Sequence, residues 1–330
     1  MEQQGLNSPF FRQERVPDVC SLRQNFAKVY RLCDTGQIVC EIPVSAGLKS
    51  PVEIAAIADP HLCQADAVDE QDEELRLTRR RRFYHVYNGA SVRAVENCLE
   101  VCRHFPQTVV LGDVIDYCSH GALTLAQQCL FGAEGTPLCI PGNHEYRKQM
   151  DTGLPEKTPN EEKARLLEQF WPNDLHFVKR QAAEDLILLG LDNGTGHFWP
   201  GTLDWLRQEL SRAEEQGCKV LILQHIAFRT ANSQGETSLA DWGFETQQQD
   251  FSQGDGALCG AARDAQDRQI LDLIAGKPDT VKAVITGHYH SLFRTVLQDS
   301  AGTPTAIPQF SLAAPIFVGF CGLVHILKVQ

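Results

Sequence analysis

The chain of 330 residues lacks the long apolar runs that a membrane protein needs. No window approaches the roughly 18 consecutive apolar residues of a membrane-spanning helix, so we expect no membrane span. The N-terminus, MEQQGLNSPFFRQE, has no apolar run behind a basic start. We therefore expect no signal peptide either.

Positive charge is also scarce. The chain has 30 Lys and Arg against 42 Asp and Glu, which gives a formal net charge of −12 and makes a nucleic-acid partner an unfavoured interpretation. A dense acidic cluster can hold divalent cations, so a phosphorylated small-molecule substrate stays open. With 43% hydrophobic and 22% charged residues the composition is that of a soluble globular protein. The length allows two domains or one large α/β domain.

The twelve cysteines form no CxxC pair, so no thiolate zinc site is indicated. Cys139, Cys218 and Cys321 lie beside or within apolar, strand-like runs, where a reduced cysteine behaves as a small hydrophobic residue. Reduced thiols in a cytoplasmic protein are the preferred interpretation, and disulfides are the alternative.

The sequence has no internal repeat and is organised around the stretch Leu138–Tyr146, LCIPGNHEY. An apolar run over 136–140 predicts a strand, and Pro141 and Gly142 end it. Asn143, His144 and Glu145 follow at once. Polar side chains at the end of a buried strand lie where α/β proteins bind ligands. Taken alone, the stretch could equally be a polar turn with a capping Asn.

Two earlier apolar runs end in the same way. The strand expected over Val52–Ala58 leads into Asp59-Pro60-His61, and the strand expected over Thr108–Leu111 leads into Gly112-Asp113-Val114-Ile115-Asp116. Alone, Asp59 could cap a turn beside an incidental His61. Three such ends in succession, joined by helical segments, instead predict a site along one rim of a sheet.

Two further strands continue this pattern. The run Lys219–Leu223 is followed by Gln224-His225, and Val281–Ile285 leads to Gly287-His288-Tyr289-His290. A sixth run, Leu186–Leu191, ends at Asp192-Asn193-Gly194. Five of the eleven histidines therefore lie in strand-end motifs: His61, His144, His225, His288 and His290. The other six lack this context and are interpreted as surface or ordinary core residues.

The remaining segments define the expected organisation. Residues 1–50 form an N-terminal extension, irregular to about residue 24, with a hairpin over Lys28–Val44. Residues 51–330 form one catalytic domain. Its polar insertion, 228–262, is expected to act as a lid, because loops of this length are functional or disordered. The charged stretch 64–82 reads as a solvated loop, with a phosphate clamp from Arg79–Arg82 as the alternative. Helices are expected over 84–104, 121–130, 161–170, 202–216 and 267–274.

The side chains at the strand ends have the chemistry of a metal site. The candidate ligands are Asp59, His61, Asp113, Asn143, His225, His288 and His290. Carboxylate oxygen, amide oxygen and imidazole nitrogen suit Mn, Fe, Zn or similar first-row ions. Seven ligands are too many for one tetrahedral ion and suit two ions that share a bridging carboxylate. Two ions about 3.5–4 Å apart can hold a hydroxide between them for in-line attack on phosphorus.

The order of these motifs resembles the signature of the calcineurin-like metallophosphoesterases, over about residues 50–295. The resemblance implies an α/β fold, a four-layer α-β-β-α sandwich with two facing mixed β-sheets and helices outside. It also implies His144 beside the phosphate, oriented by Asp116. The implied first metal takes Asp59, His61, Asp113 and His290; the second takes Asp113, Asn143, His225 and His288, with Asp113 bridging.

Two departures bear on the subfamily. Protein Ser/Thr phosphatases of this superfamily carry an Arg where this chain has Tyr117, and purple acid phosphatases place a metal-binding Tyr where it has Asp116. Neither subfamily is favoured. The expected function is metal-dependent hydrolysis of a small-molecule phosphoester, preferably a phosphomonoester. The alternatives are a phosphodiesterase of cyclic-nucleotide or nucleotide-sugar type, and a non-catalytic binding module, which should lack ligands that this chain retains.

Overall fold

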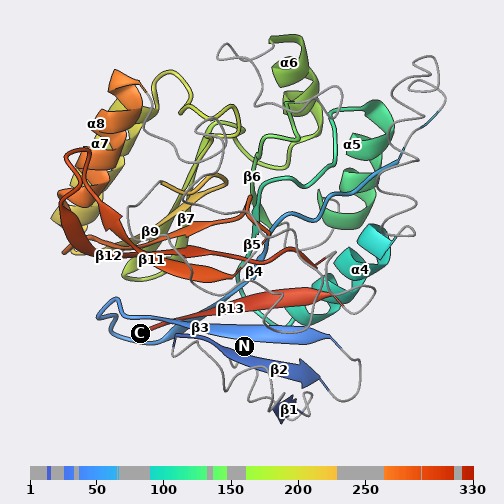
Figure 1. The fold of residues 1–330 in the computed structure, drawn as a ribbon, viewed down its shortest axis with the longest axis horizontal. Helices are drawn as coiled ribbons and strands as arrows, with labels where there is room; N and C mark the ends of the chain where they lie inside the picture. Colours follow the sequence, from blue (N-terminus) through green and yellow to red (C-terminus); the bar gives the residue numbers. More distant parts are fainter. Residues whose placement is uncertain are drawn as a thin grey trace.

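Two β-sheets face each other in the computed structural model of the chain, and helices cover their outer faces (Figure 1). The structure describes residues 13–15, 26–32, 37–64, 66, 90–131, 137–146, 161–228, 264–290, 292–315 and 322–330. Several expectations concern segments outside these ranges: Arg79–Arg82, residues 84–89, and the insertion after Phe228.

The first sheet has seven strands. Their order is β1 (Gln13–Arg15), β2 (Lys28–Leu32), β3 (Ile38–Val44), β13 (Leu323–Val329), β4 (Val52–Ile57), β5 (Thr108–Leu111) and β6 (Leu138–Ile140). The strands β4, β5 and β6 are parallel, so their carboxyl ends lie at one edge of the sheet. The hairpin strand β3 pairs with β13, which joins the N-terminal hairpin to this sheet.

The second sheet has six strands. Their order is β11 (Phe293–Gln298), β12 (Pro304–Ser311), β10 (Val281–Thr286), β9 (Lys219–Gln224), β8 (Leu186–Leu191) and β7 (Phe177–Ala183). The four central strands are parallel, and the edge strands β11 and β7 are antiparallel to their neighbours. Near-continuous apolar runs such as LILLGL in β8 fit strands that are buried on both faces.

Three apolar layers hold the sheets and helices together. The helices are α4 (Ala90–Cys102), α5 (His120–Ala126), which continues as the π-helical turn η3 (Gln127–Phe131), α6 (Glu161–Phe170), α7 (Thr202–Gln216) and α8 (Ala265–Ala275). One core lies between the sheets, a second lies under α4, α5 and α6, and a third lies under α7 and α8. Figure 1 shows the last two helices on the opposite side from α4 and α5. The expected four-layer sandwich is confirmed.

Two strands differ from the expectations. The strand β7, FVKRQAA, was not expected, because charged and small residues interrupt any apolar alternation. It is an edge strand that is only partly buried and forms by pairing with β8. The segment 1–24 was expected to be irregular, yet Gln13–Arg15 pairs with β2 as β1. Both strands depend on a partner strand rather than on a local pattern.

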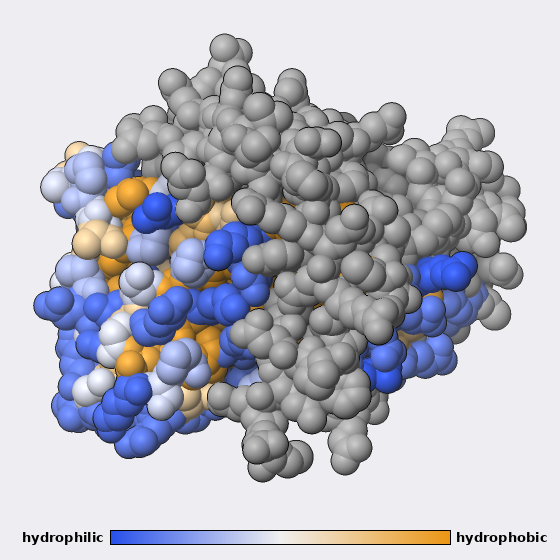
Figure 2. All heavy atoms as spheres, turned by 90° about the horizontal axis from the view of Figure 1, so that it is seen from below, coloured by the Kyte–Doolittle hydropathy of each residue, from blue (hydrophilic) through white to orange (hydrophobic). Residues whose placement is uncertain are grey.

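Figure 2 shows part of the described surface, on one face of the molecule. Seen from below, hydrophilic residues predominate and smaller apolar areas lie between them (Figure 2). Within the described ranges, no helix combines the length and apolar character needed to cross a membrane. The eight cysteines in these ranges form no disulfide.

One histidine outside the strand-end motifs is built into the first sheet. His325 lies in β13 and is fully buried; its Nε2 accepts a hydrogen bond from the Ala313 amide at 3.2 Å. Burial lowers the pKa of His325 from 6.5 to about 3. The imidazole is therefore neutral in the folded protein at neutral pH.

This burial predicts a loss of stability in acid. Between pH 6.5 and 3, His325 is protonated in the unfolded chain but neutral in the folded protein. The contribution of His325 to the free energy of unfolding is therefore fully present above pH 6.5 and falls as the pH approaches 3. The contribution has a slope of up to about 1.4 kcal/mol per pH unit. His325→Gln, which cannot titrate, should show a flatter dependence of the unfolding free energy on pH. Denaturant unfolding from pH 7 to 4.5 measures it, with His104→Gln in the turn after α4 as control. Parallel curves for wild type and His325→Gln would contradict the argument.

Candidate metal centre

The carboxyl ends of five strands meet at one place between the two sheets. From the first sheet come the loops after β4, β5 and β6, and from the second come the residues after β9 and β10. Backbone hydrogen bonds join these segments: the His61 amide donates to the Asp113 carbonyl at 2.8 Å, and the Gly287 amide donates to the His225 carbonyl at 3.0 Å. The seven candidate ligands, which span 232 positions from 59 to 290, are thereby brought together.

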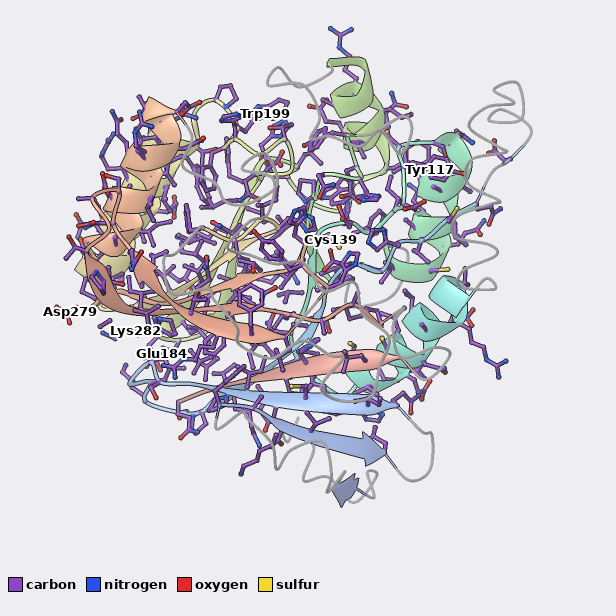
Figure 3. The ribbon with its side chains drawn as sticks, viewed as in Figure 1. Tyr117, Cys139, Glu184, Trp199, Asp279 and Lys282 are labelled. Atoms are coloured by element: carbon purple, nitrogen blue, oxygen red, sulfur yellow. The ribbon has the colours of Figure 1, made fainter. Side chains whose placement is uncertain are left out.

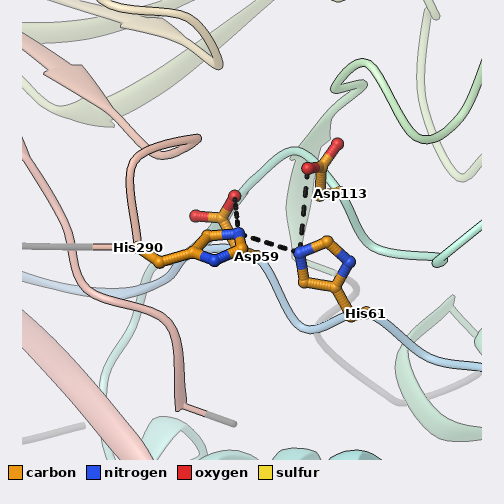
Figure 4. Close-up of side chains that lie close together, drawn as sticks. All are labelled: Asp59, His61, Asp113 and His290. Carbon is orange, nitrogen blue, oxygen red and sulfur yellow. Dashed lines mark hydrogen bonds and ion pairs between the residues drawn. The ribbon is translucent and has the colours of Figure 1, made fainter. Parts of the chain in front are cut away.

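A first cluster consists of Asp59, His61, Asp113 and His290 (Figure 4). The Nε2 atoms of His61 and His290 are 3.0 Å apart, and His290 Nε2 lies 3.4 Å from Asp59 Oδ1. His61 Nε2 lies 3.8 Å from Asp113 Oδ2. Asp59, His61 and Asp113 are buried, whereas the side chain of His290 is partly exposed. Four ligand atoms therefore point at a common centre that is open on one side.

A second cluster consists of Asp113, Asn143, His225 and His288. His288 Nδ1 lies 2.8 Å from Asn143 Oδ1 and 3.2 Å from His225 Nε2. His225 Nε2 lies 3.0 Å from Asn143 Oδ1 and 3.2 Å from Asp113 Oδ1. Asp113 thus belongs to both clusters, with Oδ2 toward the first and Oδ1 toward the second. A ligand shared by two ions must occupy such a position.

The donor chemistry of the second cluster fits a cation. His225 Nδ1 lies 2.9 Å from the Leu111 carbonyl oxygen, so Nδ1 carries a hydrogen and Nε2 is the ring atom that faces the cluster. The neighbours of Nε2 are two oxygen acceptors, from Asn143 and Asp113, and the Nδ1 of His288. Lone-pair-bearing atoms at these distances repel one another unless a cation or a proton lies between them. These residues therefore fit a bound transition-metal ion.

The charges of these groups are strongly coupled. Burial opposes ionisation of Asp113, yet the imidazoles of His144 and His225 hold its pKa well below the usual range. Burial likewise opposes the charged form of His225, yet the Asp113 carboxylate raises the pKa of His225 to about 9. Burial lowers the pKa of His61. An ionised Asp113 in a buried site requires positive charge beside it, and a bound metal ion would supply such a charge.

The backbone at the centre is held in an unusual conformation. Asp59, His61, Asp113, His288 and His290 all have positive φ, between 47° and 72°, and they are the only such non-glycine residues in the described ranges. This left-handed region costs a residue with a side chain roughly 1–3 kcal/mol. Five strained residues among seven candidate ligands indicate that the surrounding fold enforces the geometry of this site.

Two glycines allow the loops to approach each other. A Cβ at Gly112, where φ is +77°, would lie 2.3 Å from His225 Nδ1. A Cβ at Gly142 would lie 2.3 Å from Asp113 Oδ1. Any larger residue at either position would displace a candidate ligand.

Glu145 has a role that the sequence reasoning did not assign. Its buried carboxylate accepts hydrogen bonds from the backbone amides of Asp113 and Ile115, each at 3.0 Å, and of Gly142 at 2.5 Å. It therefore fixes the loop after β5 against the loop after β6. Burial and the nearby Asp113 raise the pKa of Glu145 to about 7, against the opposing effect of these hydrogen bonds. Its place directly after His144 was the only signal available in the sequence.

His144 and Asp116 lie beside both clusters. His144 Nδ1 lies 2.7 Å from the Asp116 carbonyl oxygen and 3.1 Å from its Oδ1, so Nδ1 donates and the ring orientation is fixed. His144 Nε2 lies 3.8 Å from Asp113 Oδ2. Asp116 Oδ1 also lies 3.4 Å from His61 Nδ1. The carboxylate of Asp116 thus orients the imidazole of His144 next to the candidate ligands.

Other residues singled out in the sequence lie elsewhere. Tyr117 is buried beside α5, and its hydroxyl donates to the Gln64 carbonyl (Figure 3). A further His and Asp cluster forms where His197 meets Asp264 and Asp267. Asp264 is the N-cap of α8 and forms a capping box with Asp267, so this cluster has a structural role.

One family of known proteins matches most of the chain. A family model described as calcineurin-like phosphoesterase matches residues 52–292. Among solved structures, a dimetal phosphatase from Danio rerio is similar, with 15% identity, a TM-score of 0.45, and coverage of 81% of this chain and 88% of that chain. PhoD is similar at 13% identity and a TM-score of 0.46, with coverage of 88% of this chain and 63% of that chain. No curated protein matches the chain.

Removing the charge of Asp113 tests whether it is shared by two ions. Asp113→Asn keeps the shape of the side chain but removes the negative charge that faces both clusters, so we expect turnover to be abolished and metal content to fall at both positions. Metal analysis after gel filtration measures this. Asp267→Asn, which alters a buried carboxylate at α8, is the control and should retain its metals. Two full equivalents in Asp113→Asn would contradict the bridging assignment.

Proposed function

The chain belongs to the calcineurin-like phosphoesterase family, and within the metal-dependent phosphoester hydrolysis of that family we propose that it acts on phosphomonoesters. The metal-dependent part of this proposal rests on the place of the Asp113 carboxylate, between a cluster with Asp59, His61 and His290 and a cluster with His225 and His288. Asn143 completes the second cluster through its Oδ1.

The proposed ligand sets are those of the two clusters, with Asp113 in both. When bound, a pair of Mn, Fe or Zn ions would polarise the phosphoryl oxygens and supply an activated water. The remaining chemistry belongs to the chain itself. The burial of Asp59, His61 and His225 keeps bulk water from these ligands. The strained backbone holds them in place before substrate binds.

His144 is the proposed proton donor. Its Nδ1 is engaged by Asp116, so Nε2 is the ring atom directed toward the clusters, and its side chain is 10% exposed whereas that of His61 is 0% exposed. In the protonated form, Nε2 can hydrogen-bond a phosphoryl oxygen and transfer its proton to the departing oxygen. Asp116 stabilises that imidazolium by accepting the Nδ1 hydrogen bond, which is the role of an orienting carboxylate.

The number of positive groups supports a monoester substrate. Two metal positions and His144 offer three points of positive charge. A phosphomonoester dianion presents three non-bridging oxygens, whereas a diester presents two and carries one negative charge. The monoester therefore gains more from this site. The phosphodiesterase reading is the second candidate, because the same metal pair serves diester hydrolysis.

A substrate panel separates these activities. With added Mn²⁺, we expect kcat/KM for nitrophenyl phosphate to exceed that for bis-nitrophenyl phosphate by at least about tenfold, since only the monoester engages all three positive groups. Cyclic nucleotides and nucleotide sugars extend the panel. Preference for any diester would favour the phosphodiesterase. Metal binding without hydrolysis of any member would indicate a binding module instead.

The leaving group reports on His144. Proton donation typically contributes about 10²–10⁴-fold and matters most when an alkoxide departs, because nitrophenolate leaves without a proton. We expect His144→Ala to keep its metals and to lose much more activity on an alkyl phosphate than on nitrophenyl phosphate. The measurements are kcat/KM for both substrates and metal content, with His104→Ala as control. Equal losses on both substrates would exclude proton donation; loss of metal would show that His144 supports the ligands.

A further inference from the structure

The segment Asp192-Asn193-Gly194, here called the 192–194 bracket, lies between two of the loops that carry candidate ligands. It follows β8, which pairs in parallel with β9 so that Leu191 lies opposite Gln224. The residues after both strands, including His225, are therefore neighbours. Across the sheet interface, a Cβ at Gly190 would lie 3.2 Å from Ile140 Cγ1, so β8 also packs closely on the end of β6.

Asn193 holds the loop after β9. Its Nδ2 donates to the Ile226 carbonyl oxygen at 2.7 Å, and its Oδ1 accepts from the Ile226 amide at 2.9 Å. Asn193 is fully buried, and Ile226 directly follows His225. One side-chain amide thus bonds both backbone groups of the residue next to a candidate ligand, and the Ile226 carbonyl oxygen also accepts from Gln224 Nε2 at 2.8 Å. Burial makes these two bonds costly to lose.

The two flanking residues hold the loop after β6. Tyr146 lies three positions after Asn143, and its hydroxyl donates to Asp192 Oδ2 at 2.5 Å. On the other side of Asn143, a Cβ at Gly194 would lie 2.3 Å from the Gly142 carbonyl oxygen. Only glycine permits this contact. The bracket therefore contacts the Asn143 loop on both sides of the candidate ligand.

We propose that the 192–194 bracket is a positioning element that sets the separation between Asn143 Oδ1 and His225 Nε2, which is 3.0 Å, and thereby determines the affinity of the second metal position. This inference rests on the proposed two-metal centre and concerns residues outside its ligand set. Both of these hydrogen bonds of Asn193 go to the backbone of Ile226. Asn193 therefore acts on His225 indirectly, through the backbone that carries it.

The first metal position has separate supports. Both carboxylate oxygens of Asp59 accept from the His288 amide, at 2.9 and 3.1 Å, and the His61 amide donates to the Asp113 carbonyl. Loss of the bracket leaves these bonds in place. The two metal positions should therefore respond differently to a change at Asn193.

The chain offers a matched control for Asn193. Asn173 makes the same pair of bonds with Cys139 in β6: its Oδ1 accepts from the Cys139 amide and its Nδ2 donates to the Cys139 carbonyl, each at 2.9 Å. Cys139 lies within the strand, near the centre of the fold in Figure 3, and precedes Asn143 by four positions. Asn173→Ala removes an equivalent clamp from a strand rather than from the residue beside a ligand.

Titration of the metal-free full chain with Mn²⁺ tests the proposal, with bound metal measured after equilibrium dialysis. Wild type should bind two equivalents. Asn193→Ala should bind the first equivalent unchanged and the second about 10–100-fold more weakly, the usual effect of losing a group that orients a metal ligand. Asn193→Asp keeps the acceptor for the Ile226 amide but sets a carboxylate oxygen against the Ile226 carbonyl, so it should also weaken the second equivalent. Asn173→Ala should retain both affinities while losing thermal stability.

The outcomes separate the two ideas. If wild type binds fewer than two equivalents, the proposed metal centre is wrong and the inference falls with it. If wild type binds two and Asn193→Ala binds both as tightly as wild type, the inference alone is overturned. Equal weakening of both equivalents, or the same change in Asn173→Ala, would show general loosening rather than positioning. If Asn193→Ala does not fold, the Asn193→Asp titration decides by the same criteria.

Discussion

The ionised carboxylate of Asp113, buried between two groups of histidines, is the interaction on which the site depends. Its Oδ1 faces His225 and its Oδ2 faces His61, so one carboxylate belongs to both clusters. A buried negative charge is costly unless positive charge and hydrogen bonds surround it. Here the His144 amide donates to Asp113 Oδ1 at 2.9 Å, and the Glu145 carboxylate fixes the backbone that carries Asp113. The fold supplies the hydrogen bonds, and the metal centre of the family supplies the remaining positive charge.

Each of the two sheets contributes some of the candidate ligands. The first sheet presents Asp59, His61 and Asp113 from adjacent parallel strands, and the second presents His225 and His288 from its own adjacent strands. Because neither sheet carries all of the candidate ligands, these side chains come together only when the apolar layer between the sheets is packed. That packing also maintains the left-handed backbone at five of the candidate ligands, each of which opposes folding by roughly 1–3 kcal/mol. The rigidity of the layer is thus the source of the preorganised site.

Local patterns predicted most of the fold. The strands over Thr108–Leu111 and Leu186–Leu191 and the helices over Glu161–Phe170 and Thr202–Gln216 have the bounds expected from apolar runs and amphipathic spacing. The edge strand β7 was not predicted, because its apolar and polar residues do not alternate. It forms a strand by pairing with its neighbour β8. The same limit applied at the site. Glu145 and Asn193 act by binding backbone groups of other loops, and the sequence alone does not show which backbone groups a side chain binds.

The sequence by itself determined the types of the candidate ligands and their place at the ends of strands, because carboxylate and imidazole side chains that directly follow apolar runs can be recognised without a structure. It also determined the family, through the order and spacing of the motifs from Asp59 to His290. Only the tertiary structure decided which oxygen of Asp113 faces which histidine, that Asp116 lies between His144 and His61, and that Asn193 holds the loop of His225. These are contacts between residues far apart in the chain, and their distances follow from the packing of two sheets rather than from any local preference of the backbone.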